Sequence, residues 1–197
     1  MKSIPASLPP SCAIAFKEWE GICAALASGR QSMILRKGGI DEGPGGFVPE
    51  HPAFWLYPTK VHQAEQGLKV EETGSTGLAD APEGVVPIGL LAVVNGIGRV
   101  ERPESLAALD PFHCWTQATV EKRFYYRQPG LWVLGVRVYR LPDPLMIEVT
   151  SDQAGCKTWV PLVQSISTQE AIAVLDDDRF DAELSAIRLA LSPPAVS

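Results

Sequence analysis

Apolar side chains recur along the chain with two spacings, and each spacing predicts a type of element. Near the start they recur every three to four positions, at Phe16, Trp19, Cys23 and Leu26. This spacing predicts a helix over residues 12–28 that stops at Gly29. Periodicity and capping residues predict further helices over residues 58–66, 103–109, 116–124 and 168–191, the last interrupted by the aspartates at 176–178.

Short apolar runs bounded by glycine and proline predict the strands. These runs cover residues 31–36, 54–57, 85–94, 131–141, 145–149 and 157–163. In the run 131–141, alternation places Trp132 on the core face and Arg137 on a mixed face. Asn95-Gly96 predicts a hairpin turn, and Pro142 with Pro144 predicts the end of a strand.

Helical and strand patterns do not alternate regularly, which favours an α+β fold. We expect a twisted, mostly antiparallel sheet or a small barrel, with peripheral helices and a C-terminal helical segment. The chain has 197 residues, enough to bury a core, so we expect a single domain over residues 1–197 with its core at about 13–191. Residues 71–84 hold one large apolar side chain, Leu78, and are expected to form a mobile surface loop.

Composition and charge restrict the class of partner. Apolar residues make up 46% of the chain and charged residues 20%, as in ordinary globular proteins. A net charge of −6 argues against a surface that binds any polyanion. Residues 99–140 nevertheless hold seven Lys or Arg against four acids, which is compatible with a local basic face. The alternative is that these charges are solvated and balanced by their neighbours.

The ends of the sequence and its cysteines bear on the compartment. The first residues lack the apolar stretch of a secretory signal, and the longest apolar run, Val85 to Val94, is too short to cross a bilayer. We therefore expect a cytoplasmic protein with no membrane partner. Its cysteines are far apart and predict buried free thiols rather than a metal or redox pair, at Cys12, Cys23, Cys114 and Cys156. Neither a cofactor nor a metal ion is expected.

Histidines, aromatic rings and hydroxyl groups are densest over residues 51–63. Histidine can act as a base, an acid or a metal ligand near neutral pH, and aromatic rings can stack on nucleobases. The candidate pocket residues of this segment are His51, Thr59, His62 and Gln63, and the stacking candidates are Trp55 and Tyr57. The alternative is that the rings pack in the core and the histidines are exposed or capped.

Two pairs of cations are candidate phosphate contacts. Arg36 and Lys37 precede Gly38-Gly39, where flexible backbone would let a phosphate approach N–H groups. Lys122 and Arg123 lie on the predicted helix 116–124 and would add charge. The segment Arg36 to Gly39 is not a P-loop, because the Gly-Lys-Ser/Thr ending of that motif is absent. A tight turn with solvated charges is the alternative.

The segment Gly155-Cys156-Lys157-Thr158-Trp159 suggests a cysteine nucleophile, because a neighbouring cation lowers a thiol pKa. Cys156, Lys157 and Trp159 are therefore further pocket candidates, although a turn leading into a strand explains them equally. The aspartates at 176–178 lack the spacing of a calcium loop and are better explained as a helix cap.

Several of these segments together resemble a known family. They are Ala15 to Trp19, Gly29 to Gln31, Leu35 to Ile40, Phe54 to Thr59, His62-Gln63, His113 to Thr116, Lys122-Arg123, Arg137 to Leu141 and Gly155 to Val160. In order and density they are similar to the bacterial domain-of-unknown-function family 1802. The resemblance implies no reaction. It implies an association with Mrr-type restriction endonucleases in some members, and hence a restriction-type nuclease as a partner, although the chain lacks the Asp…Glu-x-Lys nuclease core.

A second, fold-level resemblance is to PUA-like and ASCH-type barrels, in which a helix leads through a glycine into a strand bearing arginine. The ASCH pattern G-x-K-x-x-E-x-R would fall on residues 29–36, where Gly29 and Arg36 match. Gln31 and Ile34 replace its lysine and glutamate, which weakens any catalytic reading.

Three functional hypotheses follow from the sequence. The first is a non-catalytic nucleic-acid-recognition or accessory module that binds DNA or RNA through Arg36, Lys37, Lys122 and Arg123, with Trp55 or Tyr57 for stacking. The second is an enzyme of unknown reaction whose site holds His51, His62, Cys156 or Tyr57. The third is a structural protein that binds a protein partner.

Overall fold

The computed structural model describes residues 1–4, 7–37, 51–60, 67–69, 76, 80–153, 155 and 157–192. The strands are β1 (Lys2–Ser3), β2 (Ser11–Trp19), β3 (Met33–Arg36), β4 (Ala53–Thr59), β5 (Val85–Val100), β6 (Leu131–Glu148), β7 (Trp159–Ser167) and β8 (Ile172–Ala173). The α-helices are α1 (Glu20–Ala27), α2 (Glu104–Leu109), α3 (Gln117–Tyr125) and α4 (Asp177–Ala190).

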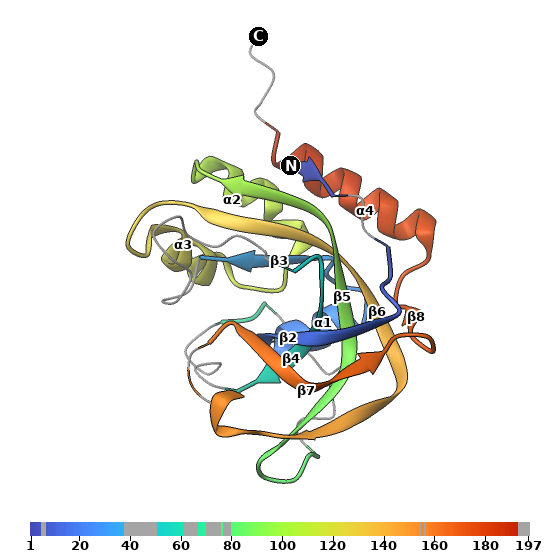
Figure 1. Cartoon of the computed structure of the whole chain (residues 1–197). Coiled ribbons are helices and arrows are strands. Elements are labelled where there is room, and N and C mark those ends of the chain that lie inside the picture. The colour runs from blue at the N-terminus through green and yellow to red at the C-terminus, as the bar shows by residue number, and fades with distance from the viewer. Residues whose placement is uncertain are drawn as a thin grey trace.

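The described strands form one strongly curved sheet in the order β3-β6-β5-β4-β2-β7, with β1 added to β5 and β8 to β6. Strands β2 and β4 pair in parallel, whereas the other pairs are antiparallel. Figure 1 shows β3 beside α3 in one half of the molecule and β2, β4 and β7 in the other, joined by the long strands β5 and β6. The predicted α+β fold with a mostly antiparallel sheet is confirmed.

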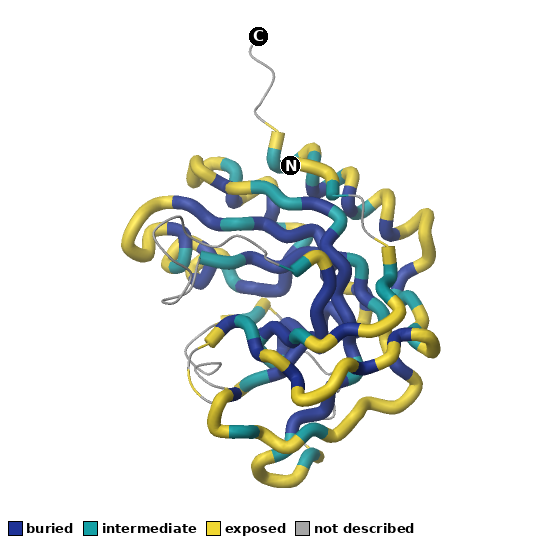
Figure 2. The backbone as a smooth tube through the Cα atoms, in the orientation of Figure 1, coloured by how far each residue is buried: buried dark blue, intermediate teal, exposed yellow. Residues whose placement is uncertain are grey.

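The core lies on both sides of the central strands (Figure 2). Alternate residues of β4 enter different apolar clusters: Phe54 and Leu56 belong to the larger one, and Trp55 and Tyr57 to the other. Since successive side chains of a strand point to opposite faces, β4 is covered by apolar side chains on both. This double burial explains the near-continuous apolar run in its sequence.

The predicted helix over residues 12–28 is wrong in its first half. Residues 11–19 form β2, which pairs with β4 on one side and β7 on the other, and α1 begins only at Glu20. Residues Phe16 and Trp19 therefore share no helix face with Cys23. Backbone pairing on both sides of β2 stabilises the strand more than the local spacing of apolar residues favours a helix. A single sequence does not reveal this pairing.

Two predicted breaks in the central strands are also wrong. Strand β5 continues through Asn95 and Gly96 with a register shift in place of a hairpin. Strand β6 continues through Pro142 and Pro144, because residues 141–144 bulge opposite Gly89 and need no ladder hydrogen bonds there. A Cβ on Gly89 would lie 3.0 Å from Cβ of Pro144, so the close approach requires glycine.

Smaller elements agree in part with the predictions. Helix α3 is capped by the Thr116 hydroxyl and α4 by the Asp176 carboxylate, which accepts from the Arg179 amide at 2.8 Å. Helix α2 also occurs as predicted. Pro58 and Thr59 end β4 instead of starting a helix, and the rest of that helix lies outside the described residues. The segment after Thr168 forms a turn and β8, so the helix predicted there starts only with α4.

Cys12, Cys23 and Cys114 are buried, as predicted, and Cys12 and Cys23 are free thiols, whereas Cys156 lies outside the described residues. Burial raises the pKa of the Cys12 and Cys23 thiols, so neither is activated as a nucleophile. Within the described residues, no helix is long and apolar enough to span a membrane. In the same ranges, no three histidine, cysteine or acidic side chains gather as a metal site would require.

Candidate functional site

A cleft of about 630 Å³ opens where several strand ends meet. Because β2 and β4 are parallel, they end together, with Lys17 beside Tyr57 and Trp19 beside Thr59. Strand β7 is antiparallel to β2, and its start brings the carbonyl of Thr158 to the amide of Lys17, at 2.9 Å. Among the described residues no backbone pairing joins β3 to β2 or β7, so this end of the curved sheet stays open.

The cleft wall carries an excess of cations. Its residues come from the ends of β2, β3 and β4, from the segment before β5 and from the segment before β7. The charged side chains among them are Lys17, Arg36, Lys60, Lys157, Glu18 and Glu83. The aromatic ones are Trp19 and Tyr57. Four cations therefore face two carboxylates in a hollow that also offers two aromatic rings.

Arg36 bridges the open end of the sheet with its side chain. Its Nη2 donates to the Thr158 hydroxyl at 2.9 Å, and its Nη1 lies 3.8 Å from Glu18 Oε2. Its guanidinium also lies 4.7 Å from the centre of the Phe16 ring. Arg36 thus links β3 to β2 and to the segment before β7, and its side chain remains 15% exposed to the cleft.

Glu18 is the buried acid of the site, with 2% of its surface exposed. Its Oε1 accepts from the Trp19 amide at 2.9 Å, whereas its Oε2 has no hydrogen-bond partner among the described residues. A buried carboxylate oxygen is costly unless it is compensated by charge or hydrogen bonds. The arginines on either side, Arg36 and Arg123, supply the charge.

Arg123 lies behind the cleft between two indole rings. Its guanidinium is 4.8 Å from the centre of the Trp19 ring and 5.1 Å from that of Trp115. Burial, reinforced by the like charge of Arg36 and opposed by Glu18, lowers the pKa of Arg123 to about 10. With a pKa of about 10, Arg123 stays charged at neutral pH and adds its charge to the Arg36–Glu18 pair.

Lys17 and Tyr57 form the floor beside β7. The Lys17 ammonium donates to the carbonyls of Gln153, at 2.5 Å, and Gly155, at 2.8 Å, and lies 5.6 Å from the centre of the Tyr57 ring. Burial raises the pKa of the Tyr57 hydroxyl, which therefore stays protonated and able to donate at neutral pH. Lys17 therefore holds the segment before β7 in place and also forms part of the cleft wall.

Some of the sequence-derived candidates meet in this cleft. Arg36, Tyr57, Thr59 and Lys157 all line it, although they come from different parts of the chain. Arg123 lies behind the cleft wall, against the Trp19 ring, and Lys122 is exposed on α3. The other candidates lie elsewhere or outside the described residues.

Trp55 and Lys37 are committed to other contacts. Trp55 is fully buried, and its indole N–H donates to the Cys12 carbonyl at 3.0 Å, so its ring has no exposed face for a base. The Lys37 ammonium donates to the carbonyls of Phe124, at 2.8 Å, Gly130, at 2.9 Å, and Gln128. Lys37 therefore holds the α3–β6 turn, and we do not include either residue among the ligand contacts.

His51 and Trp159 contact each other with ring centres 5.0 Å apart, and Trp159 packs edge-on against Phe16 and Phe54. Neither lines the cleft. His62, Gln63 and Cys156 lie outside the described residues, as do most residues of the expected loop 71–84. The pairing of His51 with His62 therefore stays a prediction.

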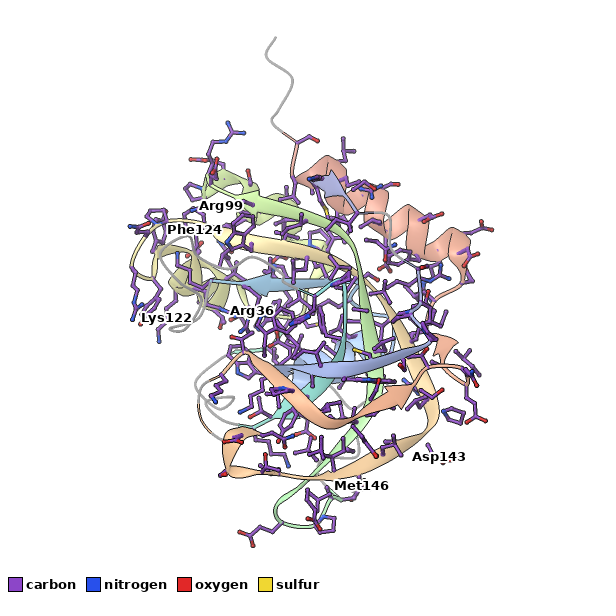
Figure 3. All side chains as sticks on the ribbon, viewed as in Figure 1. Arg36, Arg99, Lys122, Phe124, Asp143 and Met146 are labelled. Carbon is purple, nitrogen blue, oxygen red and sulfur yellow. The ribbon has the colours of Figure 1, made fainter. Side chains whose placement is uncertain are left out.

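The basic residues of the segment 99–140 do not share one face. Arg137 pairs with Asp177 of α4, and the Arg140 guanidinium donates to the Ala27 carbonyl at the end of α1. Arg99 and Lys122 lie instead on the side of the molecule that also bears Arg36 (Figure 3). The local basic surface is therefore smaller than the sequence count suggests.

Sequence reasoning missed four charged residues of the wall, Lys17, Glu18, Lys60 and Glu83. The first two lie in the stretch predicted as helix, where a lysine next to a glutamate indicates an exposed face. The signal that could have found them is the parallel alignment of Lys17-Glu18-Trp19 with Tyr57-Pro58-Thr59, and that alignment depends on tertiary structure.

These features define an α+β protein with a curved, mostly antiparallel sheet and a cation-lined cleft at its open end. The chain belongs to the family described as "Domain of unknown function (DUF1802)", whose model matches residues 15–186. Among curated proteins, none matches this sequence.

Two solved structures are similar to this chain at 12% sequence identity. One is ASCH from Zymomonas mobilis, with a TM-score of 0.40, covering 88% of this chain and 94% of that one. The other is a mutant form of ASCH from the same organism, with a TM-score of 0.38, covering 90% of this chain and 98% of the other.

Proposed function

We propose that the protein is a nucleic-acid-recognition module whose cleft binds one nucleotide unit of a single strand. The observation that carries this proposal is the joint presence of four cationic side chains and two aromatic rings in one hollow. Phosphate groups need cations, and bases need flat apolar surfaces on which to stack. The wall offers both within a single cavity.

The size of the cleft supports a single-stranded ligand over a duplex. Its volume of about 630 Å³ lies within the range of roughly 300–1,000 Å³ typical of small-ligand sites. A single nucleotide whose base is turned out of its strand fits a cavity of this size. A double helix, in contrast, is recognised by protein elements that protrude into one of its grooves.

The net charge of −6 does not oppose this proposal, because the cations act locally. Arg36 and Arg123 flank the single carboxylate of Glu18, and Lys60 and Lys157 add charge at the exposed rim. In a hollow with low-dielectric walls such charges concentrate their field at the mouth. Attraction at the cleft and weak repulsion elsewhere favour selective binding.

Exposed rim lysines give the sharpest test, because changing them does not disturb the core. The Lys60 side chain is 57% exposed with Glu20 3.7 Å away, and Lys157 is exposed. We expect the double variant Lys60→Glu/Lys157→Glu to weaken binding of labelled single-stranded oligonucleotides at least ~10-fold, since two phosphate contacts become repulsive. Fluorescence anisotropy with single- and double-stranded DNA and RNA measures this.

The control is Arg179→Glu on α4, which reverses one exposed cation outside the cleft. It should change affinity no more than about twofold, as expected for a screened distant charge. Equal losses in both variants, or no binding of any nucleic acid by the unmodified protein at low salt, would contradict the proposal. A comparison of DNA with RNA in the same titration decides which is preferred.

An enzymatic role of the same cleft is the second candidate, favoured by the buried Glu18, whose Oε2 pairs with Arg36 but has no hydrogen-bond donor among the described residues. A carboxylate beside a ligand cleft is able to take a proton from a substrate or a water molecule. In that case Glu18→Gln keeps ligand binding but abolishes product formation, measured by mass spectrometry of incubated oligonucleotides and nucleosides. Unchanged substrates with the unmodified protein would contradict this role.

A restriction-type nuclease remains the partner class that the family resemblance suggests. Affinity purification of the tagged chain from its native host tests this suggestion. Recovery of a nuclease subunit with the protein would support it, and recovery of the chain alone would count against it.

A further inference from the structure

A row of side chains leads out of the cleft across three adjacent strands. Arg36 on β3 lies directly opposite Trp132 on β6, and Trp132 lies directly opposite Arg99 on β5. Residues directly opposite in neighbouring strands share one face of the sheet. The guanidinium of Arg99 lies 5.5 Å from the centre of the Trp132 ring, so cation and ring are in contact.

The α3–β6 turn extends this row with further exposed groups. The Tyr126 side chain is 57% exposed, and the Arg127 guanidinium lies 5.2 Å from the centre of its ring. A Cβ built on Gly130 would lie 3.2 Å from Nε of Arg99, which places Arg99 directly against the turn. We call Arg99, Tyr126, Arg127 and Trp132 the basic–aromatic stripe.

The stripe is held in place from the cleft side. Lys37 directly follows Arg36 and donates to the carbonyls of Phe124, Gln128 and Gly130, which fixes both ends of the turn. Arg127 adopts a φ of 61°, a strained conformation for a residue other than glycine. The turn thus presents Tyr126 and Arg127 in a fixed orientation beside the cleft.

We propose that the basic–aromatic stripe binds the nucleotides that flank the one in the cleft, so that a single strand runs from Arg36 across Trp132 to Arg99 and the turn. This inference rests on the proposed function. The exposed Tyr126 ring and the half-buried Trp132 ring, each next to an arginine, match the alternating bases and phosphates of an unstacked strand. Arg99 pairs with Glu101, whose carboxylate lies 4.0 Å away and is 73% exposed, and so exposed a pair is readily replaced by a phosphate.

The path has a defined length. Two spacings between neighbouring strands of ~4.8 Å separate Arg36 from Arg99, about 10 Å in total. Affinity should therefore rise with oligonucleotide length over the first few nucleotides and then level off. A cleft acting alone would bind a mononucleotide and a longer strand equally well.

The test compares uridine 5′-monophosphate with oligouridylates of two to eight nucleotides by calorimetry. The double variant Arg99→Ala/Tyr126→Ala removes an exposed cation and an exposed ring without touching the core. We expect it to bind the mononucleotide as the unmodified protein does and the longer strands ~10-fold more weakly, a loss typical of one stacking contact. The control Arg179→Ala/Leu189→Ala removes a cation and an exposed apolar side chain from α4 and should change neither.

A second measurement maps the path directly. Photo-crosslinking of an oligomer containing 4-thiouridine, followed by peptide mass spectrometry, should mark the peptide that holds Tyr126 and Trp132. If the mononucleotide binds but length and the stripe variant have no effect, the stripe serves another partner and the inference is wrong. If neither mononucleotide nor oligomer binds, the proposed function itself fails.

Discussion

Buried ionisable side chains determine how single residues of this protein respond to pH. His113 is 4% exposed, and its ring centre lies 5.8 Å from that of Trp115. Burial and the nearby Lys69 ammonium, opposed by Asp110, lower the pKa of His113 to about 4. Its Nδ1 has no hydrogen-bond partner among the described residues, so a charged imidazole would gain little at this position.

We predict that His113 makes the protein sensitive to mild acid. A histidine in the unfolded chain has a pKa near 6.5. Between about pH 6.5 and 4, His113 therefore binds a proton in the unfolded chain but stays neutral in the folded chain. The free energy of unfolding should be unaffected by His113 above pH 6.5 and fall by up to about 3 kcal/mol as the pH drops to 4. Urea unfolding at several pH values measures this.

The matched variants are His113→Gln, which cannot titrate, and His51→Gln, which removes a half-buried histidine elsewhere. His113→Gln should flatten the pH dependence between 6.5 and 4, and its effect should exceed that of His51→Gln. Identical curves for the His113→Gln variant and the unmodified protein would show that the buried imidazole does not govern acid stability.

At the scale of elements, side chains replace backbone pairing where the sheet is open. Arg36 connects β3 to Thr158 and Glu18, and Lys37 connects the same strand to the turn after α3. One short strand therefore positions both the cleft and the turn that carries Tyr126. The Lys37 ammonium adds a donor to carbonyls at the end of α3, where the helix itself supplies few, and the Phe124 carbonyl also accepts from the Gly130 amide at 3.1 Å.

We predict that Lys37→Met destabilises the fold by about 1–3 kcal/mol, since it removes the ammonium that the carbonyls of Phe124, Gln128 and Gly130 share. Chemical denaturation measures the loss. Lys122→Met on the exposed face of α3 is the control and should stay within about 0.5 kcal/mol. A similar small effect of both substitutions would mean that water satisfies the carbonyls equally well.

Considered as a whole, the molecule is acidic but bears its ligand-facing cations on one side. In the proposed binding mode, the cleft rim and the stripe supply about four phosphate contacts, from Lys60, Lys157, Arg99 and Arg127. The curved sheet makes this possible, because it brings strand ends from distant parts of the chain to one open end (Figure 1).

We predict that single-strand affinity falls roughly 50-fold between about 50 and about 200 mM salt, because each of about four contacts releases counterions with a slope of about −0.7. Anisotropy titrations at several salt concentrations give the slope directly. In the Lys60→Glu/Lys157→Glu variant the slope should be roughly halved. Affinity that does not vary with salt would exclude phosphate contacts as the source of binding.

Strand and helix positions were predictable where local pattern and tertiary pairing agree. The Thr116 and Asp176 caps, the buried run of β4 and the start of β6 follow from residue type alone. The continuation of β6 past Pro142 was not predictable, because it depends on Gly89 of the facing strand. The grouping of Arg36, Tyr57 and Lys157 was likewise hidden, although each residue was a candidate by its chemistry.

The sequence by itself determined the α+β class, the caps and the chemical types available for a site, because these depend on neighbours within a few positions. Only the tertiary structure decided that residues 11–19 form a strand and that Lys17 and Glu18 therefore reach the cleft. It likewise separated Arg36, which faces the cleft, from Lys37, which faces the turn. The reason is that these roles depend on pairing between strands that are far apart in the sequence. The free energy of this pairing exceeds the local conformational preference of the residues.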